Sequence, residues 1–298
     1  MIELNIDNNL YPNSLKLIPN SPKKLYCEGN IDLLTKPSIA IIGSRNCTEN
    51  GKKIAEQFAK ELSMSGITII SGLAKGIDTV AHTFSYNNLG KTISVLGSGL
   101  ERIYPIENIP LYQKILDNNG LIVSEYPAKE MYNSDNFRAR NRIISGLSLG
   151  VLVVEATYRS GTSITAQHAI SQKRPIFCIP HEIWDSHGVG TNKLIKNGAF
   201  LVTSSEDILK ILKLTSIKKI YNQLKKNNSF DKTPLKGTKK FKNNKLQQIY
   251  DMIDSNNSIS VNNIAKLTGF PVNEVLSITS ILEIDGYIKK TEGGYVCT

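Results

Sequence analysis

Cysteine is scarce in this sequence of 298 residues, and its four cysteines are scattered. They are Cys27, Cys47, Cys178 and Cys297, and no two of them form a C-x-x-C pair. Such spacing argues against a disulfide framework and against a zinc ribbon. The pattern fits a protein of the reducing cytoplasm.

Long apolar runs are missing as well. No stretch approaches the roughly 18 apolar residues that a membrane span needs. Residues 1–4, Met-Ile-Glu-Leu, also lack the basic and apolar regions of a secretory leader. We therefore expect a cytosolic protein with no membrane partner.

Several enzyme signatures are absent or incomplete. The sequence has no G-x-x-x-x-G-K-[ST] loop for ATP, and residues 97–99, Gly-Ser-Gly, lack the third glycine of a dinucleotide fingerprint. The G-x-S-x-G pattern at residues 146–150 runs from a predicted helix into a predicted strand, the reverse of a nucleophile elbow. Cys178, His181 and His187 match no common metal-site spacing and lack a fourth ligand. We expect no catalytic residues, no metal and no cofactor.

Acidic residues are in deficit. The chain has 26 Asp and Glu against 36 Lys and Arg, which gives a net charge of +10 and a pI near 9.3. A polyanion is the expected partner of such a protein. A Lys- and Asn-rich genome composition would raise the net charge in the same way. Whether the protein binds a polyanion therefore has to be judged from where the cations lie.

From residue 39 onward, short apolar runs alternate with segments of helical periodicity. The predicted strands are 39–42, 67–70, 92–96, 121–124, 151–154, 176–179 and 200–202. The predicted helices are 48–63, 77–86, 109–116, 141–147, 162–171, 191–195 and 206–212. This alternation predicts an α/β fold with an extended Rossmann-like, doubly wound and mostly parallel sheet over residues 37–212.

The flanking segments have a different character. Residues 1–36 have apolar positions separated by Pro and Asn, so we expect an irregular segment that packs on the core, with an edge strand at 25–27. Residues 213–245 are rich in Lys and Asn and are expected to form a basic linker. Three predicted helices and a β-hairpin within 246–298 indicate a small winged-helix domain.

Two glycine loops follow neighbouring predicted strands, at residues 43–45 and 71–76. A right-handed βαβ connection places both loops at the carboxyl edge of the sheet, where ligands bind. Glycine lets the backbone approach a ligand, helix N-termini offer N–H groups, and Arg45 and Lys75 supply positive charge. The loops indicate an anion site, although glycine also serves turn geometry alone. The candidate residues are Gly43, Ser44, Arg45, Gly72, Lys75 and Gly76.

Two further segments are rich in phosphate-binding side chains. Residues 136–142 place three arginines at alternate positions just before a predicted helix, and arginine both binds phosphate and stacks on bases. Residues 159–163, Arg-Ser-Gly-Thr-Ser, precede another helix and form a second candidate cradle. A solvated basic turn is the alternative for the arginine segment, and Phe137 either stacks on a base or packs in the core. The candidate residues are Phe137, Arg138, Arg140, Asn141, Arg142, Ser160, Gly161 and Thr162.

Several short motifs follow one another through the α/β segment. They are Ile-Ile-Gly-Ser-Arg (41–45), Ser-Gly-Leu-Ala-Lys-Gly-Ile-Asp (71–78), Val-Leu-Gly-Ser-Gly-Leu (95–100), Ser-Glu-Tyr-Pro (124–127), Arg-Asn-Arg-Ile-Ile-Ser-Gly-Leu-Ser (140–148), Val-Val-Glu-Ala (153–156) and Gly-Thr-Asn-Lys-Leu-Ile (190–195). The ordered set closely resembles the DNA-processing protein A (DprA/Smf) family. Such a set is far more specific than any one motif.

The resemblance implies an extended Rossmann domain that binds single-stranded DNA, forms a homodimer and loads RecA recombinase onto incoming strands during natural transformation. The family's DNA contacts would fall on residues 43–45, 72–76 and 137–142. Their cations would line a groove that neutralises the DNA backbone. The sequence departs from the family at residues 1–36, which are too short for the N-terminal helical domain of many members, and at His181, where many members have glycine.

Two other interpretations are open. A nucleotide-processing hydrolase of the lysine-decarboxylase-like Rossmann group would have a Pro-Gly-Gly-x-Gly-Thr loop and a following acid. Here residues 159–162, Arg-Ser-Gly-Thr, stand in that place, and Gln167 stands where the acid is wanted. A scaffold that acts only through the winged helix would leave the arginines of the α/β loops unused. We therefore expect binding rather than catalysis.

Overall fold

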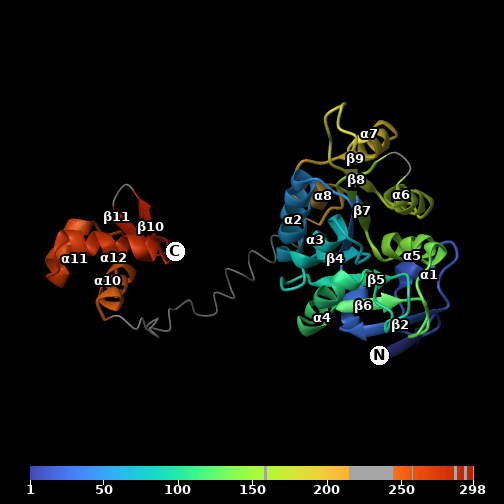
Figure 1. Cartoon of the computed structure of the whole chain (residues 1–298), viewed down its shortest axis with the longest axis horizontal. Coiled ribbons are helices and arrows are strands. Elements are labelled where there is room, and N and C mark those ends of the chain that lie inside the picture. The colour runs from blue at the N-terminus through green and yellow to red at the C-terminus, as the bar shows by residue number, and fades with distance from the viewer. Residues whose placement is uncertain (158–159, 215–243, 257, 285–286, 292–293, 298) are drawn as a thin grey trace. The chain divides into compact units, whose positions relative to one another are not determined.

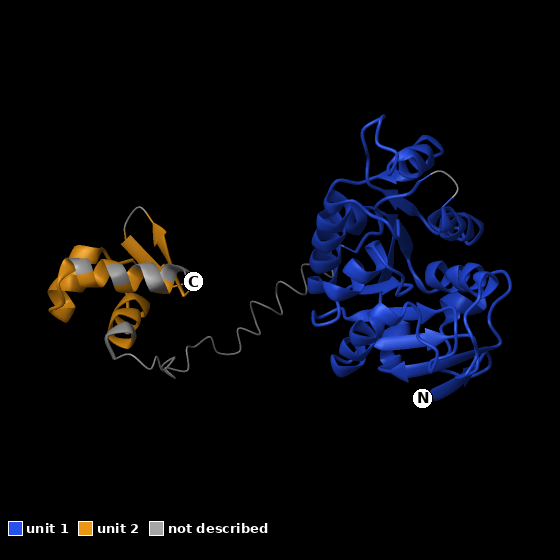
Figure 2. Ribbon diagram, in the orientation of Figure 1, with its two compact units in different colours: residues 1–223 blue, residues 224–298 orange. Residues whose placement is uncertain are grey.

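A nine-stranded sheet is the central element of the computed structural model, which describes residues 1–157, 160–214, 244–256, 258–284, 287–291 and 294–297 (Figure 1). The chain divides into two compact units, Met1–Gln223 and Leu224–Thr298 (Figure 2). Each unit has a hydrophobic core of its own.

The large sheet lies in the first unit, with strand order β1-β2-β6-β5-β4-β3-β7-β8-β9. Neighbours from β6 to β9 in this order pair in parallel, whereas β1 and β2 are antiparallel. The predicted doubly wound, mostly parallel α/β fold is confirmed. The bounds are β1 Ile2–Asn5, β2 Lys24–Gly29, β3 Ser38–Ile42, β4 Thr68–Ser71, β5 Thr92–Leu96, β6 Leu121–Ser124, β7 Gly150–Val153, β8 Ile176–Cys178 and β9 Phe200–Leu201.

The side chains of the inner strand β3 enter two separate cores. Ile39 and Ile41 pack with residues of α2, α3 and α8, whereas Ala40 and Ile42 pack with residues of α5 and α6. Because successive side chains of a strand point to opposite faces, helices cover both faces of the sheet. The helices are α1 Asn13–Lys16, η1 Ile31–Thr35, α2 Glu49–Met64, α3 Ile77–Thr83, η2 Ile106–Asn108, α4 Ile109–Asp117, α5 Ser134–Leu147, α6 Gly161–Ser171, α7 Val189–Lys196 and α8 Ser205–Ile211.

Helix α2 shows how the sequence sets an element. The Thr48 hydroxyl accepts a hydrogen bond from the Gly51 N–H at 2.9 Å, so Thr48 caps the helix. Ala55, Phe58 and Leu62 recur at helical spacing and are buried against the sheet. Burying a side chain of the size of Phe or Leu contributes about 1.5–3 kcal/mol. The apolar face therefore fixes α2 on the sheet.

The N-terminal segment differs from its prediction. Residues 1–36 are not irregular, because β1 and β2 extend the sheet by an antiparallel pair. Strand β2 is also not an edge strand, because it lies between β1 and β6. The edge strand on this side of the sheet is β1. Only Leu4 of β1 is buried, and four residues with one buried position carry too little pattern to predict a strand. Tyr11 and Leu15 pack into the core of the first unit.

The second unit contains three helices and an antiparallel strand pair among its described residues. They are α10 Asn244–Asp254, α11 Val261–Thr268, α12 Val272–Ile284, β10 Ile288–Thr291 and β11 Gly294–Cys297. Ile249, Ile264, Val275 and Tyr295 are buried in its core. The winged-helix assignment stays a prediction, and residues 215–243 of the predicted linker lie outside the described residues. None of the helices in the described ranges is long and apolar enough to cross a membrane.

Candidate nucleic-acid interface

A cavity of 1120 Å³ lies at the carboxyl ends of β3 and β7. The strand order reverses between these two strands, and open α/β sheets bind ligands at such a point. The cavity brings together predicted residues from three segments: Gly43, Ser44, Arg45, Phe137, Arg138, Arg140, Asn141, Ser160, Gly161 and Thr162. The predicted residues Gly72, Lys75, Gly76 and Arg142 do not line it.

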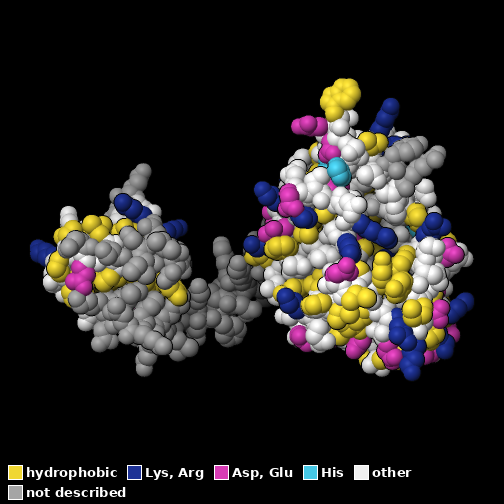
Figure 3. Space-filling view, viewed as in Figure 1, with side chains coloured by type: hydrophobic (Ala, Val, Ile, Leu, Met, Phe, Trp, Pro, Cys, Tyr) yellow, Lys and Arg dark blue, Asp and Glu magenta, His cyan; other side chains and the backbone are white. Residues whose placement is uncertain are grey.

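Positive charge dominates the cavity. Arg45, Arg138 and Lys193 contribute cations in addition to Arg140, and Asp78 is the one acid among its described lining residues. Figure 3 shows Lys and Arg side chains beside a patch of apolar side chains on the visible face of the first unit. The predicted candidate Arg159 lies outside the described residues. The cavity is therefore suited to an anion.

Arg45 is an exposed cation on a loop of the cavity wall. Its side chain is exposed, and its loop is fixed because the Ile77 N–H donates to the Ser44 carbonyl at 3.2 Å. Within the described part of the chain, no hydrogen bond or ion pair engages its guanidinium. The group is thus available to a ligand phosphate.

The three alternate arginines lie within helix α5 rather than before it. Asn133 caps this helix by accepting hydrogen bonds from the Asp135 and Asn136 N–H groups, so the helix begins several residues before its predicted start. Residues two apart in a helix are separated by about 200° around its axis. Arg140 therefore lies on the opposite side of the helix from Arg138 and Arg142, which are about 40° apart around the axis. Arg142 does not line the cavity, and the prediction that all three arginines line one DNA-binding groove stays a prediction.

Arg140 is a buried side chain, 4 % exposed. Its Nη1 donates to the carbonyl oxygens of Gly72, at 2.7 Å, and of Val95. Burial lowers the pKa of its guanidinium to about 10, so the group is charged at neutral pH. Arg140 therefore holds the loop at residues 71–76 from the protein interior, with its Nη1 directed at backbone carbonyls.

The same loop is held by two buried side chains of α3. Asp78 accepts hydrogen bonds from the Gly72 N–H at 3.0 Å and from the Ala74 N–H at 3.4 Å. The His82 Nε2 accepts from the Leu73 N–H at 3.3 Å, which leaves Nδ1–H to donate to the Thr92 hydroxyl at 2.8 Å. Burial lowers the pKa of His82 to about 3, so its ring is neutral. Buried side chains thus hold the loop in place through hydrogen bonds to its backbone.

Lys75 and Arg142 are engaged in ion pairs. Lys75 Nζ lies 2.6 Å from Glu107 Oε1, with both side chains more than half exposed. Arg142 Nη2 contacts both Glu125 oxygens, at 2.6 and 2.8 Å, and its Nε donates to the Asn20 carbonyl at 2.9 Å. Its side chain is only 12 % exposed. Through the hydrogen bond to Asn20, Arg142 connects the N-terminal segment to α5.

Gly76 is where the two glycine loops meet. Its φ is +78°, and a Cβ there would overlap the carbonyl oxygens of Ser44 and Arg45. Both features favour glycine, because positive φ is costly for other residues and backbone atoms cannot move aside. The position of Arg45 therefore depends on a residue outside the cavity.

Replacing Gly76 with alanine is expected to lower the free energy of unfolding by about 3 kcal/mol, the combined cost of positive φ and steric overlap. Gly198→Ala is the matched control, because Gly198 has φ of +96° and an added Cβ would meet nothing within 4 Å. Its loss should be only about 1–2 kcal/mol. Urea unfolding measures both. Equal losses in the two variants would mean that the loops do not approach closely.

Phe137 belongs to an aromatic cluster that includes two tyrosines. Its ring centroid lies 5.5 Å from that of Tyr104 and 6.2 Å from that of Tyr132, and the tyrosine rings are 4.3 Å apart. Phe137 is half-buried over Gly97, whereas Tyr104 and Tyr132 are 39 % and 37 % exposed. The tyrosines were missed by the sequence analysis, although Tyr132 is only five residues from Phe137.

The start of α6 forms another part of the cavity wall. Ser160 caps this helix without a side-chain hydrogen bond to it. The buried Ser160 Oγ has no hydrogen-bond partner among the described residues. An anion at a helix N-terminus is stabilised by N–H groups and by the helix dipole, and a free hydroxyl adds a donor.

The DNA recombination-mediator protein A family model matches residues 3–213. This chain belongs to that family. The match covers the sheet from Glu3 onward and every cavity segment, so the family resemblance seen in the motifs is confirmed.

Individual members of the family match different lengths of this chain. The DNA processing protein DprA of Streptococcus pneumoniae is 45 % identical over 68 % of this chain and 71 % of its own. Its crystal structure matches with a TM-score of 0.67 at 43 % identity, covering 70 % of this chain and 73 % of that one. The Smf protein of Escherichia coli is 37 % identical over 97 % of this chain and 75 % of its own.

A Helicobacter pylori DNA processing protein A structure matches with a TM-score of 0.64 at 34 % identity. It covers 72 % of this chain and 96 % of that chain. That structure describes a single-stranded DNA binding mode of the H. pylori protein.

Proposed function

We propose that this protein binds single-stranded DNA in the cavity between β3 and β7, without catalysis. The observation that carries the proposal is the cation-lined cavity at the switch point of the sheet. Arg45 and Arg138 pair with backbone phosphates. Another phosphate binds at the N-terminus of α6, where Ser160, Gly161 and Thr162 lie. The aromatic cluster around Phe137 supplies surfaces on which bases stack.

Single-stranded rather than duplex DNA is favoured by two features. Aromatic rings stack only on bases that are free of their own neighbours. The single-stranded DNA binding of the H. pylori relative supports the same choice. The duplex has no unstacked base to offer to Phe137, Tyr104 or Tyr132.

The wider role that we propose is recombination mediation. The protein would protect incoming single strands and load RecA recombinase onto them, in natural transformation or in recombination generally. Membership of the recombination-mediator family supports this role. The proposed location is the cytosol, in keeping with four free cysteines, of which Cys27 and Cys178 are buried.

A homodimer is also part of the proposal. Two cavities on one dimer would bind a long strand with a higher effective concentration than one cavity does. The edge strand β9 offers unpaired backbone groups, and its Phe200 and Leu201 are 44 % and 52 % exposed. An apolar edge strand of this kind favours self-association. Sedimentation velocity of the full chain measures the mass directly.

The hydrolase alternative is not favoured. The one acid among the described lining residues is Asp78, and its carboxylate accepts two backbone N–H groups and is buried. Gln167 lines the cavity where such an enzyme would have an acid. A general base that can reach a substrate is therefore missing from the described lining.

The proposal is tested by titrating labelled oligonucleotides of equal length, single-stranded and duplex, and recording fluorescence anisotropy over a series of salt concentrations. We expect tighter binding of the single strand and an affinity that falls steeply with salt. Equal binding of both forms, or none, would reject the single-strand function. RecA loading is then measured as the rate of filament growth on strands pre-bound by this protein.

A further inference from the structure

The loop between β8 and α7, residues 180–188, carries two of the most exposed apolar side chains of the first unit. Ile183 is 79 % exposed and Trp184 is 89 % exposed. Trp184 is the single tryptophan of the chain. An aromatic side chain of this size is usually buried, so its position in solvent indicates a surface that binds something.

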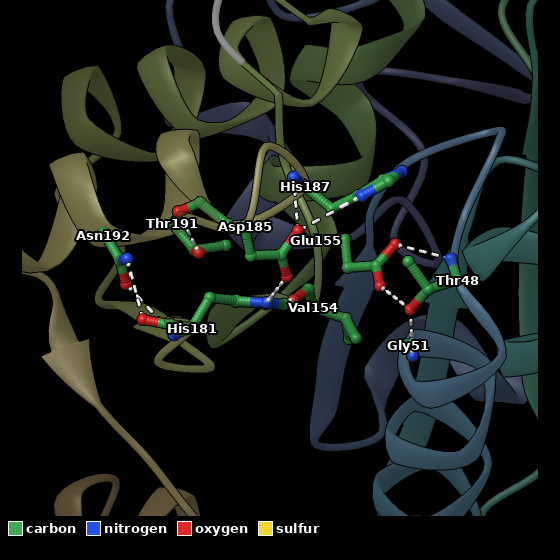
Figure 4. A network of polar contacts seen from close by, with 10 residues as sticks. Thr48, Gly51, Val154, Glu155, His181, Asp185, His187, Thr191 and Asn192 are labelled. Atoms are coloured by element: carbon green, nitrogen blue, oxygen red, sulfur yellow. Dashed lines mark hydrogen bonds and ion pairs between the residues drawn. The ribbon is translucent and has the colours of Figure 1, made fainter. Parts of the chain in front are cut away.

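The base of this loop is held by a network of polar contacts (Figure 4). The His181 ring contacts Asp185 Oδ2 and the Val154 carbonyl, both at 2.9 Å. Asn192 binds the His181 backbone on both sides, accepting from its N–H at 3.1 Å and donating to its carbonyl at 3.0 Å. Asp185 also accepts the His187 N–H at 2.8 Å, and these hydrogen bonds hold the pKa of Asp185 below its usual range. The apolar tip is therefore mounted on a fixed base.

The network connects the loop to the cavity. His187 lines the cavity, and its carbonyl accepts the Ala156 N–H at 2.8 Å. The preceding residue, Glu155, is fully buried and accepts hydrogen bonds from Thr48 N and Oγ1, at 3.1 and 2.5 Å. Thr48 caps α2 directly after the Arg45 loop. Figure 4 shows the two halves of this network next to each other at the end of β7.

The loop therefore stands at the rim of the cavity. The C-terminal end of the loop reaches the cavity, because His187 lines the cavity wall and Gly190 and Lys193 line it further along the chain. Proteins hold single strands with cations that follow the phosphates and aromatic rings on which bases stack. Here an exposed aromatic ring lies on a loop that reaches a cation-lined cavity.

We propose that Trp184, supported by Ile183, is a stacking platform for an unpaired nucleobase of the strand that leaves the cavity over this rim. The inference rests on the proposed single-strand function and adds a contact on a separate loop from the Phe137 cluster. The ligand group of this platform is a base rather than a phosphate, because Trp184 and Ile183 carry no charge that would attract an anion.

The single tryptophan makes the test direct. Emission excited beyond the absorption of tyrosine reports only on Trp184, and a stacked base quenches it. We expect quenching by oligothymidylate that saturates together with the anisotropy of the labelled strand. An abasic oligonucleotide of the same length should bind through its phosphates without quenching. Unchanged emission on a bound oligothymidylate, or equal quenching by the abasic strand, would overturn the platform.

Variants give a second, independent readout. Trp184→Ala should weaken single-strand binding about fivefold to a hundredfold, the range for losing one stacked base. Its salt dependence should equal that of the wild type, because no phosphate contact is lost. Trp184→Phe should restore most of the affinity. Leu17→Ala is the matched control, because Leu17 is 86 % exposed on the N-terminal segment, and it should bind like the wild type.

The outcomes separate the two proposals. Absence of any anisotropy change in the wild type rejects the single-strand function itself. Normal binding by Trp184→Ala together with unquenched wild-type emission rejects only the platform, and the exposed tip then belongs to a protein partner. Reduced affinity that Trp184→Phe does not restore also counts against stacking.

Discussion

Replacing Arg45 with alanine is expected to weaken binding of a single-stranded oligonucleotide by about tenfold to a hundredfold. Hydrogen bonds to charged groups contribute about 1.5–3 kcal/mol, and the Arg45 guanidinium is exposed on the cavity wall. The slope of log affinity against log salt should also become shallower by about 0.7, the value for one phosphate contact on a single strand. Anisotropy titrations across a salt series measure both quantities.

Lys60→Ala is the matched control for Arg45→Ala. Lys60 is an exposed cation on α2, which begins beside the Arg45 loop and runs away from it. Its removal changes the net charge by the same amount and should leave affinity nearly unchanged. Equal losses in the two variants would mean that total charge, rather than the cavity, determines binding. Unfolding free energies should stay within about 0.5 kcal/mol of the wild type in both.

Replacing Arg140 with alanine should have the largest effect on stability, a loss of about 3–5 kcal/mol in the free energy of unfolding. The change leaves the carbonyls of Gly72 and Val95 without their buried donor. It also removes the positive charge that lowers the pKa of buried Asp78 against the raising effect of burial. Urea denaturation followed by circular dichroism measures the loss.

Arg138→Ala is the control for Arg140→Ala, two residues away on the same helix. Its side chain is 66 % exposed, and its contact with Asp135 is 3.7 Å long. An exposed pair of this kind contributes little, so we expect a change within about 0.5 kcal/mol. If Arg140→Ala were as stable as Arg138→Ala, the buried hydrogen bonds to the loop at residues 71–76 would not matter to the fold.

Local patterns in the sequence were enough to predict most of the sheet. The all-apolar run at residues 39–42 marks a strand buried on both faces, and it is the inner strand β3. The helix at 48–63 was predicted to within one residue because Thr48, its cap, and the apolar face of α2 both leave clear signals. Strand β1 left none, because its pairing with β2 is a tertiary event.

The candidate site was predicted in composition rather than in geometry. The loops with Arg45 and Ser160 meet in one cavity because parallel strands end at one edge, a rule that sequence alternation already invokes. The sequence could not tell which arginines of α5 are exposed and which are buried, because their exposure follows from the helical phase set by the Asn133 cap. Trp184 gave no signal at all, since exposure of a lone aromatic residue depends on the loop that carries it.

The pairing of β7 with β3 also sets a condition on synthesis by the ribosome. Val153 pairs opposite Ile42, which left the ribosome long before it. Until β7 emerges, β3 ends the growing sheet, with apolar side chains on both faces and an open row of backbone groups that invites wrong pairing. Because the cavity walls come from both sides of this junction, a nascent chain that stops before β7 has no cavity. Strand β7 therefore joins the two halves of the sheet, and the segments that follow it, α6 and α7, complete the cavity wall before the newly made protein can hold a ligand.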